Sequence, residues 1–575
     1  MGKPIRCLYP CLRFRARPLS LNASTSYLRF YQAVRSYSAT QHGDEQPSGS
    51  AHDPSKGNHV AEPRIRIRSG PPESKYDPEL YPRIAAQKEA IDYATFAERY
   101  KSLKMGETHS DPVVVRAGSK LAFIDLFQEN RQIQCLVNYE KISGSGLSPT
   151  AFKEFLGTLH RGDVFSISGI PHRTQRAELS VLATELPQLL SRCIRPLPND
   201  VKDKETLIRN RHVDLLLNPR LSDTFLLRAE IINFLRQFLL DDGHIEVQTP
   251  ILADGAGGAV ARPFQTSATE FSDRDLALRI APELWLKRLI LGGFERVFEI
   301  GPSFRNEGID MTHNPEFTTC EFYKTYADLD SLIATTEKMF QCLSRIVSTL
   351  LTTTCRSLPR LPSTIDFSPP YPRLDFIPVL ETALNLSLPN LTSPTAHADL
   401  LEIFNQKNIS LPPHPTLPRL LDKLSSIHLE PRSLNTPIWI IHHPSCLSPL
   451  SKSFPHPKRP GQMVSARAEL FIEGKEFVNC YEEENEPLEQ RRKFEEQVIL
   501  TRQKSNDTDN STPSEKLEVD ESYLQALEWG LPPTGGWGCG VDRLCMLFSR
   551  SARIADVLSF GTLRNVVSLK REGKR

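Results

Sequence analysis

The sequence lacks the signature of the commonest phosphate-binding loop. No segment of the 575 residues matches G-x-x-x-x-G-K-[ST], the loop whose backbone amides cradle phosphates. No apolar run approaches the roughly 20 residues that a membrane-spanning helix needs, and we therefore expect no membrane partner. The eleven cysteines include no C-x-x-C pair with a second pair at zinc spacing. We expect reduced thiols without structural disulfides.

Acidic residues are absent from the first 43 residues, which contain seven Lys and Arg, many Ser and scattered Leu, Phe and Tyr. This composition is typical of a mitochondrial transit peptide, and Arg35-Ser36-Tyr37 resembles a site for a matrix protease. We predict a removable segment over residues 1–37, a flexible linker over 38–95, and a location in the mitochondrial matrix. A basic tail that binds RNA is the alternative.

A small β-domain is predicted over residues 96–200. Five short β-rich runs lie there, separated by glycine and charged turns, with a helical piece at 149–159 after the third run. This order indicates an OB-fold barrel. Because such barrels stack bases on exposed aromatic rings, Phe123 is a candidate for base stacking, with Arg116 and Gln134 as candidates for contacts with base edges. The same pattern also allows Phe123 to be a core residue.

A larger domain is predicted over residues 201–575. Residues 225–240 have apolar side chains at helical spacing, and the following strand-like run ends at Pro250, which favours the edge of a sheet. A long helix beside an edge strand could form a dimer surface, and a buried helix is the alternative. Residues 351–460 are rich in proline and are predicted to form a variable insertion at the edge of this domain.

The stretch from Phe304 to Phe317 concentrates polar residues between two strand-like runs. It contains Arg305, Glu307 and His313 and ends in an aromatic ring. A guanidinium fork suits a phosphate, and a ring beside carboxylates suits an adenine base. The composition therefore indicates an ATP site that has no glycine-rich phosphate loop.

Two later segments contain further candidate ligands. If residues 473–474 form a two-residue hairpin turn, Glu469 and Glu476 become diagonal neighbours on one sheet face, close enough to share a divalent cation. A solvated pair of glutamates is the alternative. A glycine-rich strand at 535–540 then precedes a helix, in which Arg543 could face a phosphate across the sheet.

Together these segments resemble the class II aminoacyl-tRNA synthetases, and most closely their lysyl branch in its mitochondrial form. The resemblance covers about residues 110–345 and 430–565, and the strings at 278–284 and 313–318 are specific to this branch. It implies an α+β fold in which an OB-fold barrel precedes an antiparallel sheet flanked by helices. It also implies a homodimer that binds ATP, Mg²⁺, L-lysine and tRNA(Lys).

The resemblance further implies roles for single residues. Those expected to contact ATP are Arg305, Glu307, His313, Phe317, Glu476 and Arg543, of which Arg305 and Arg543 would also be catalytic. Those expected to hold Mg²⁺ are Glu469 and Glu476. Those expected to bind lysine are Gly257, Gly258, Glu283, Glu321, Tyr323, Asn479 and Glu483. The anticodon would be bound by Arg116, Phe123 and Gln134.

The side chains expected around the substrate agree with this branch. Two carboxylates and a tyrosine suit a long cationic side chain, whereas an aspartate- or asparagine-specific relative needs a cationic or amide-type pocket. Glu283 and Glu483 therefore decide the predicted substrate class. A lysine ligase that modifies a protein would lack the barrel. A degenerate RNA-binding relative would be expected to lose one of Arg305, Glu469, Glu476 and Arg543.

Four positions depart from the family pattern without removing a named ligand. They are Pro302, Cys539, Ala555 and Gly561.

Overall fold

The chain divides after residue 201 in the computed structural model, giving one unit over residues 1–201 and a second over 202–575. The structure describes residues 31–33, 93–105, 121–128, 131–142, 146–195, 197–198, 201–254, 261–362, 365–505 and 519–568. Among these residues, no helix combines the length and the apolar character required to cross a bilayer.

The first unit contains a five-stranded sheet in the order β1-β2-β3-β6-β5 and a two-stranded sheet of β4 and β7. Helix α3 (Pro149–Thr158) follows β3, and Ser148 caps it by accepting from Ala151 N. This arrangement confirms the predicted OB-fold class. The remaining elements are β1 (Tyr31–Ala33), α1 (Tyr93–Arg99), β2 (Leu121–Gln128), β3 (Arg131–Asn138), α2 (Tyr139–Ile142), β4 (Val164–Ser166), β5 (Gly169–Arg173), β6 (Leu179–Ala183) and β7 (Gln188–Ser191).

The second unit is built on an eight-stranded sheet in the order β14-β15-β18-β19-β20-β13-β12-β8. Its strands are β8 (Ile245–Glu246), β12 (Arg296–Phe304), β13 (Glu316–Thr325), β14 (Arg373–Asp375), β15 (Ile438–Ile441), β18 (Arg467–Ile472), β19 (Lys475–Glu482) and β20 (Thr534–Gly540). All neighbouring pairs are antiparallel except β12–β8 and β14–β15. The predicted antiparallel sheet is therefore confirmed, and the strand before Pro250 lies at its edge.

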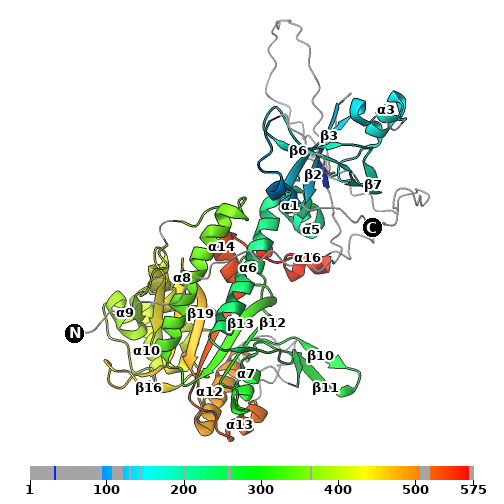
Figure 1. The fold of residues 1–575 in the computed structure, drawn as a ribbon. Coiled ribbons are helices and arrows are strands. Elements are labelled where there is room, and N and C mark those ends of the chain that lie inside the picture. Colours follow the sequence, from blue (N-terminus) through cyan, green and yellow to red (C-terminus); the bar gives the residue numbers. More distant parts are fainter. Residues whose placement is uncertain are drawn as a thin grey trace, which may run out of the picture. The chain divides into compact units, whose positions relative to one another are not determined.

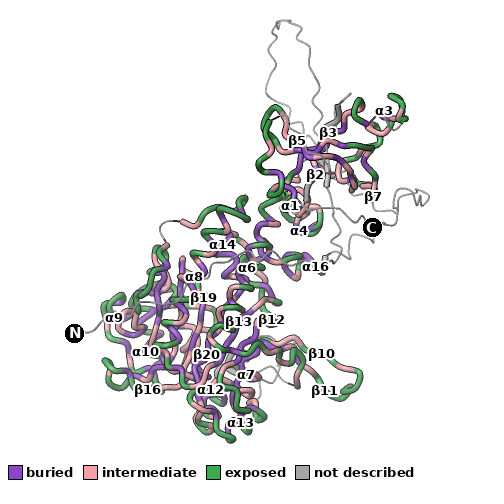
Figure 2. The backbone as a smooth tube through the Cα atoms, in the orientation of Figure 1, coloured by how far each residue is buried: buried purple, intermediate pink, exposed green. Residues whose placement is uncertain are grey.

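Three helices cover one face of this sheet: α6 (Pro219–Asp241), α8 (Leu329–Thr353) and α14 (Val541–Ser549) (Figure 1). The apolar stripe expected over 225–240 is buried at every fourth position of α6, at Leu227, Ile231, Leu235 and Leu239. It packs with Phe322 and Trp537 of the sheet, whose rings stack with centroids 5.0 Å apart. Figure 2 shows the buried residues concentrated along these strands and helices.

The proline-rich segment 351–460 contributes to the main sheet as well as to its edge. Strands β14 and β15 come from it, and β15 pairs with β18. Apolar residues of its helices and of β15 form a separate core with Val464 and Phe471. Its other elements are α9 (Phe376–Leu384), α10 (Ala396–Gln406), α11 (Leu417–His428), η3 (Glu430–Ser433), η4 (Ser445–Leu447) and β16 (Ser453–Pro455), with β17 (Met463–Ser465) after it.

Helix α7 (Glu283–Leu291) contacts β12 and β13 and shares a third core with α13. The remaining elements of the second unit are α4 (Lys204–Arg209), α5 (Arg211–Leu217), β9 (Leu252–Ala253), β10 (Gln265–Ala268), β11 (Phe271–Leu278), α12 (Pro487–Ser505), α13 (Glu521–Leu527), α15 (Ile554–Val557) and α16 (Leu563–Ser568).

Candidate active site

Strand register gathers polar side chains on the sheet face opposite α6, α8 and α14. Directly opposed residues of paired strands lie on the same face. One row crosses five strands as Glu299, Glu321, Gly538, Asn479 and Glu469. The adjacent row consists of Tyr323, Gly536, Tyr481 and Arg467. Above these rows lies a cavity of about 440 Å³, which Glu321, Tyr323, Asn479 and Tyr481 line.

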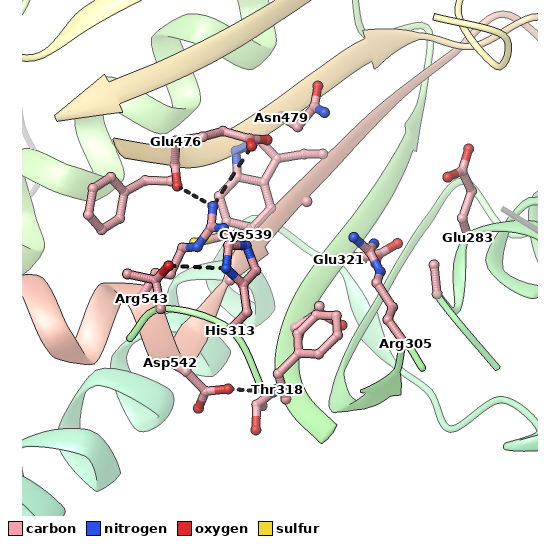
Figure 3. Close-up of a pocket in the computed structure, with 18 of the residues that line it drawn as sticks. Glu283, Arg305, His313, Thr318, Glu321, Glu476, Asn479, Cys539, Asp542 and Arg543 are labelled. Carbon is pink, nitrogen blue, oxygen red and sulfur yellow. Dashed lines mark hydrogen bonds and ion pairs between the residues drawn. The ribbon is translucent and has the colours of Figure 1, made fainter. Parts of the chain in front are cut away.

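The cavity has two chemically different sides (Figure 3). Arg543, His313 and Glu476 gather at one side, whereas Glu283 and Glu321 lie near Arg305 at the other. The first side offers cationic and hydrogen-bonding groups for phosphates, and the second offers carboxylates for an ammonium group.

The loop between β12 and β13 brings Arg305 to this cavity. Its ends are tied by Arg305 N, which donates to Pro315 O at 2.8 Å, and by Phe304 N, which donates to Arg279 O at 3.0 Å. The Arg305 guanidinium carbon lies 5.2 Å from the centre of the Phe317 ring. The predicted phosphate ligand and the predicted adenine-stacking ring are therefore neighbours in space.

Hydrogen bonds determine which nitrogen of His313 carries the proton. Arg543 Nη2 lies 2.9 Å from His313 Nε2, and because a guanidinium only donates, Nε2 is the acceptor. Nδ1–H then donates to Asp310 Oδ2 at 2.8 Å. Burial would raise the pKa of Asp310, but the backbone N–H of Thr312, followed by the imidazole and the backbone N–H of His313, outweighs this effect and holds the pKa at about 2.

Helix α14 begins directly after β20, and the buried Asp542 anchors it. Asp542 Oδ2 accepts from Thr318 N at 2.7 Å, and Oδ1 pairs with Arg228 of α6. The next residue, Arg543, donates from Nη1 to Glu476 O at 3.1 Å. The glycine-rich strand and the start of α14 thus place Arg543 against the β18–β19 hairpin.

The β18–β19 hairpin has the two-residue turn that the sequence predicted. Glu473 and Gly474 both have positive φ, 50° and 73°, and Phe471 pairs with Glu476. A bulge between Leu470 and Phe471 shifts the register before Glu469, which pairs with Asn479.

The two glutamates of this hairpin differ in their surroundings. Both Glu469 oxygens are engaged, one by Arg467 and the other by His443 at 3.0 Å. These partners outweigh the effect of burial and hold the pKa of Glu469 at about 2. Glu476 lines the cavity, and burial together with the charge of Glu469 raises its pKa. A cation between the two would relieve this repulsion, so the donor set fits a hard divalent ion.

The acidic side of the cavity is formed mainly by Glu321 and Glu283. Glu321 is only 8% exposed, and burial, followed by the charge of Glu283, raises its pKa to about 8. Tyr323 Oη lies 3.5 Å from Glu321 Oε2. Glu283 is the first residue of α7 and lines the cavity.

Behind Glu283 lies a buried ion-pair cluster. Lys287 Nζ is 2.6 Å from Glu283 Oε1 and 2.5 Å from Glu483 Oε2, and both Lys287 and Glu483 are 0% exposed. Glu483 is not among the residues that line the cavity. Glu483 pairs with Lys287, which pairs with the cavity residue Glu283, so Glu483 can affect a ligand in the cavity only through these two residues.

Asp375, His442 and His456 form a second cluster of possible metal ligands, with ligand atoms within 4.8 Å of one another. Lys458 N donates to His456 Nδ1 at 2.9 Å, so the proton of this imidazole sits on Nε2 and points to Asp375 Oδ1, 2.9 Å away. A metal-bound histidine instead donates from its other nitrogen to an acceptor. We therefore assign this cluster as a hydrogen-bonded junction between β14, β15 and β16.

Comparison with known proteins agrees with this geometry. Residues 203–564 match the family model of class II tRNA synthetases for D, K and N. A lysine–tRNA ligase (cla4) of Cladosporium cladosporioides is 40% identical over 82% of this chain and 80% of its own length. A mitochondrial lysine–tRNA ligase of Schizosaccharomyces pombe is 38% identical over 85% and 91%. A probable cytoplasmic lysine–tRNA ligase of Enterocytozoon bieneusi is 39% identical over 78% and 85%.

The chain belongs to the class II lysyl-tRNA synthetases. The cavity of this synthetase brings together most of the residues that the sequence singled out for ATP and lysine, namely Glu283, Arg305, Glu307, His313, Phe317, Glu321, Tyr323, Glu476, Asn479 and Arg543. Glu469 and Glu483 are not among the residues that line the cavity. Each forms an ion pair with a basic residue, Arg467 for Glu469 and Lys287 for Glu483.

The remaining predicted residues are four that the structure does not fully describe and one that belongs to the first unit. Gly257, Gly258 and Arg116 lie outside the described residues, as does the side chain of Phe123. Gln134 is buried in the first unit, where its amide donates to Glu178 and its oxygen accepts from Ser180 Oγ at 2.9 Å.

Several residues of the site were missed from the sequence. His443 and Arg467 hold Glu469, and no local pattern marks either of them. Lys287 could have been noticed, because it follows Glu283 by four residues, the spacing of an ion pair on a helix. Ser448 and Leu450, from the segment predicted as an insertion, also line the cavity.

Proposed function

We propose that this synthetase activates L-lysine with ATP in the described cavity, transfers the lysyl group to tRNA(Lys), and does so in the mitochondrial matrix. The observation that carries the proposal is a single cavity that has Arg543 and His313 at one side and the carboxylates Glu283 and Glu321, next to Arg305, at the other. ATP and a dibasic amino acid need such groups next to each other, because the amino-acid carboxylate must reach the α-phosphorus.

The ATP end is assigned to residues of the β12–β13 loop and of α14. Arg305 binds the α-phosphate, and Glu307 accepts from the adenine amino group. Phe317 and Arg543 enclose the adenine ring, and Arg543 together with His313 approaches the outer phosphates. The contact between Arg543 and His313 supports this assignment, because a phosphate can take over the Arg543 donor that His313 now accepts.

The lysine end is assigned to the acidic side of the cavity. Glu321 binds the α-ammonium with help from Gly257 and Gly258, and Asn479 lies in the same pocket. Glu283, Tyr323 and Glu483 together provide for the ε-ammonium. Glu283 contributes directly, and Glu483 contributes through the buried cluster behind it. Buried carboxylates favour a cationic side chain over a neutral one of similar length.

The reaction proceeds in two steps. An oxygen of the lysine carboxylate attacks the α-phosphorus of ATP, and pyrophosphate leaves with the electrons of the broken P–O bond. The 3′-hydroxyl of the tRNA then attacks the lysyl carbonyl carbon, its proton is released, and AMP leaves. Arg305 and Arg543 stabilise the charge that develops on the phosphate oxygens. The protein forms no covalent bond in either step.

Glu469 and Glu476 are the residues that would hold Mg²⁺. When bound, Mg²⁺ would neutralise charge on the phosphates of ATP. Arg467 and His443 support this role, because they keep Glu469 ionised and oriented. Arg467 also donates to Leu447 O at 2.8 Å, which ties this pair to the cavity wall.

Apolar side chains exposed beside α6 support a homodimer. Ile245 and Leu252 are each 48% exposed, and Leu240 and Phe294 are 42% exposed. These residues lie around the edge strand β8 and the segment of Pro250. Light scattering of the purified protein should give about twice the chain mass of 64.9 kDa.

The mitochondrial part of the proposal rests on the composition of the first residues. Residues 1–37 would be the transit peptide, 38–95 a linker, 96–200 the anticodon-binding domain with Arg116 and Phe123, and 201–575 the catalytic domain. A fluorescent protein fused after residue 43 should enter mitochondria, whereas a fusion with Arg13, Arg15 and Arg17 changed to Gln should stay in the cytosol. Equal import of both fusions would contradict this part.

The enzymatic part is tested by amino-acid-dependent ATP–pyrophosphate exchange with each of the twenty amino acids. Lysine should support exchange far better than any other. Arg305→Ala should reduce the exchange rate about 100-fold or more, the loss expected for one preorganised donor to the reacting group. Arg288→Gln is the matched control, because Arg288 packs on Trp285 and donates to Ser522 outside the cavity. Near-normal exchange by Arg305→Ala would contradict the assignment.

A further inference from the structure

We propose that Lys287 is a positioning residue for substrate lysine. Its buried ammonium neutralises one of two carboxylates, Glu283 and Glu483, and leaves the equivalent of one carboxylate for the substrate ε-ammonium. This inference rests on the proposed function, because it concerns how the same pocket selects its substrate.

The contacts of Lys287 show how it controls the pocket. It lies one helical turn after Glu283 on α7 and bridges Glu283 Oε1 and Glu483 Oε2 at 2.6 and 2.5 Å. This leaves Glu283 Oε2 for a ligand in the cavity that Glu283 lines. Lys287 does not line the cavity itself, so it acts on a ligand only through Glu283.

The surroundings hold this cluster in one geometry. The Lys287 ammonium lies 6.0 Å from the Tyr323 ring centre and 5.9 Å from that of Tyr523. Glu483 Oε1 packs against Gly536, where a Cβ would lie only 1.9 Å from it. Glycine is therefore needed at 536 for Glu483 to reach Lys287.

The charges in this region do not balance without a substrate when Glu283 and Glu483 are both ionised, and burial accordingly raises the pKa of Glu483 to about 8. Two carboxylates meet one ammonium, and the other titratable groups that face the cluster add no cation: they are Tyr323, Tyr481, Tyr523, Glu321 and Glu484, the last of which is paired with Lys493 at 2.6 Å. Arg288 faces Tyr523 from the protein surface. A buried unpaired charge is unfavourable, so the pocket favours a ligand that brings one positive charge.

Without Lys287, two buried carboxylates would face each other unpaired and would resist ionisation. The Lys287→Met variant should therefore raise the KM for lysine in ATP–pyrophosphate exchange about 10- to 100-fold at pH 7. The KM for ATP should stay within about twofold of the parent value. The lysine KM of this variant should improve as the pH rises from 7 to 9, because ionisation of Glu483 is then restored.

A double variant separates positioning from a merely structural role. Lys287→Met with Glu483→Gln removes one charge of each sign and leaves Glu283 to pair with the substrate. It should recover lysine binding to within about tenfold of the parent. Arg288→Gln, on the same helix but outside the cluster, is the control and should leave both KM values unchanged.

The outcomes are decisive. An unchanged lysine KM in Lys287→Met, an equal rise in both KM values, or a loss that neither high pH nor Glu483→Gln relieves would overturn the proposal. If Lys287→Met does not fold by circular dichroism, the double variant decides: near-parental lysine KM supports the proposal, and failure to fold or to bind lysine overturns it. If the parent shows no lysine-dependent exchange, the proposed function fails first, independently of Lys287.

Discussion

The ionisation of Glu321 should make lysine binding depend on pH. Burial and the nearby charge of Glu283 raise the pKa of this carboxyl to about 8. About nine-tenths of the empty sites therefore hold a protonated Glu321 at pH 7. If Glu321 pairs with the α-ammonium of the substrate, it must first ionise, which costs about 1.4 kcal/mol at pH 7 and almost nothing at pH 9.

This cost of ionising Glu321 makes the lysine KM depend measurably on pH. We expect the lysine KM in ATP–pyrophosphate exchange to fall about fivefold between pH 7 and pH 8 and to level off near pH 9 because of Glu321 alone. The KM for ATP, measured in the same assays, is the internal reference. Glu483, whose pKa burial also raises to about 8, adds to the slope of the parent.

The Glu321→Gln variant isolates the share of Glu321. It should bind lysine more weakly at every pH. A plot of the logarithm of its lysine KM against pH should be less steep than that of the parent, by the slope that corresponds to release of about one proton. Identical slopes for the two proteins would refute the reasoning.

The same shift predicts a change in stability. A pKa raised on folding from 4.5 to about 8 gives a contribution that is fully present below pH 4.5 and is lost as the pH rises through 8. Glu321→Gln removes this loss, so its melting temperature relative to the parent should rise between pH 6 and pH 9. A constant difference would contradict the buried, protonated state.

Two further substitutions test the geometry of the site. Gly536→Ala brings a Cβ within 1.9 Å of Glu483 Oε1, so we expect the lysine KM in exchange assays to rise at least about tenfold. The control is Gly157→Ala on α3, where the added Cβ meets nothing within 4 Å, and it should leave the lysine KM unchanged. Equal lysine KM values for the two variants would argue against this packing. Asp310→Ala removes the acceptor of His313 Nδ1–H and should lower kcat about tenfold, the equivalent of one hydrogen bond. Nitrogen NMR of the His313 ring should show loss of the Nδ1–H form, and an unchanged spectrum would contradict the assigned tautomer.

The sequence was most informative where the deciding contacts are local. The turn at Glu473 and Gly474, the buried stripe of α6 and the helix after β3 depend on neighbours within four residues, and each has the predicted form. Motif strings also indicated which residues of this synthetase face a common cavity, although these residues come from distant parts of the chain. That knowledge comes from resemblance to a family and not from the periodicity of the chain.

The sequence by itself determined the fold class, the family and most candidate ligands, because short-range periodicity and motif residues are visible along a single chain. The tertiary structure alone decided how charges are shared. It placed Lys287 between two carboxylates, put His443 against Glu469, and buried Gln134 among its own neighbours. A lysine in a sequence has the appearance of a surface residue, since lysine is almost never fully buried unless it is paired. Its partner Glu483 directly follows β19 and lies 196 positions away in the sequence. Only the pairing of β13, β20 and β19 brings the end of β19 beside α7.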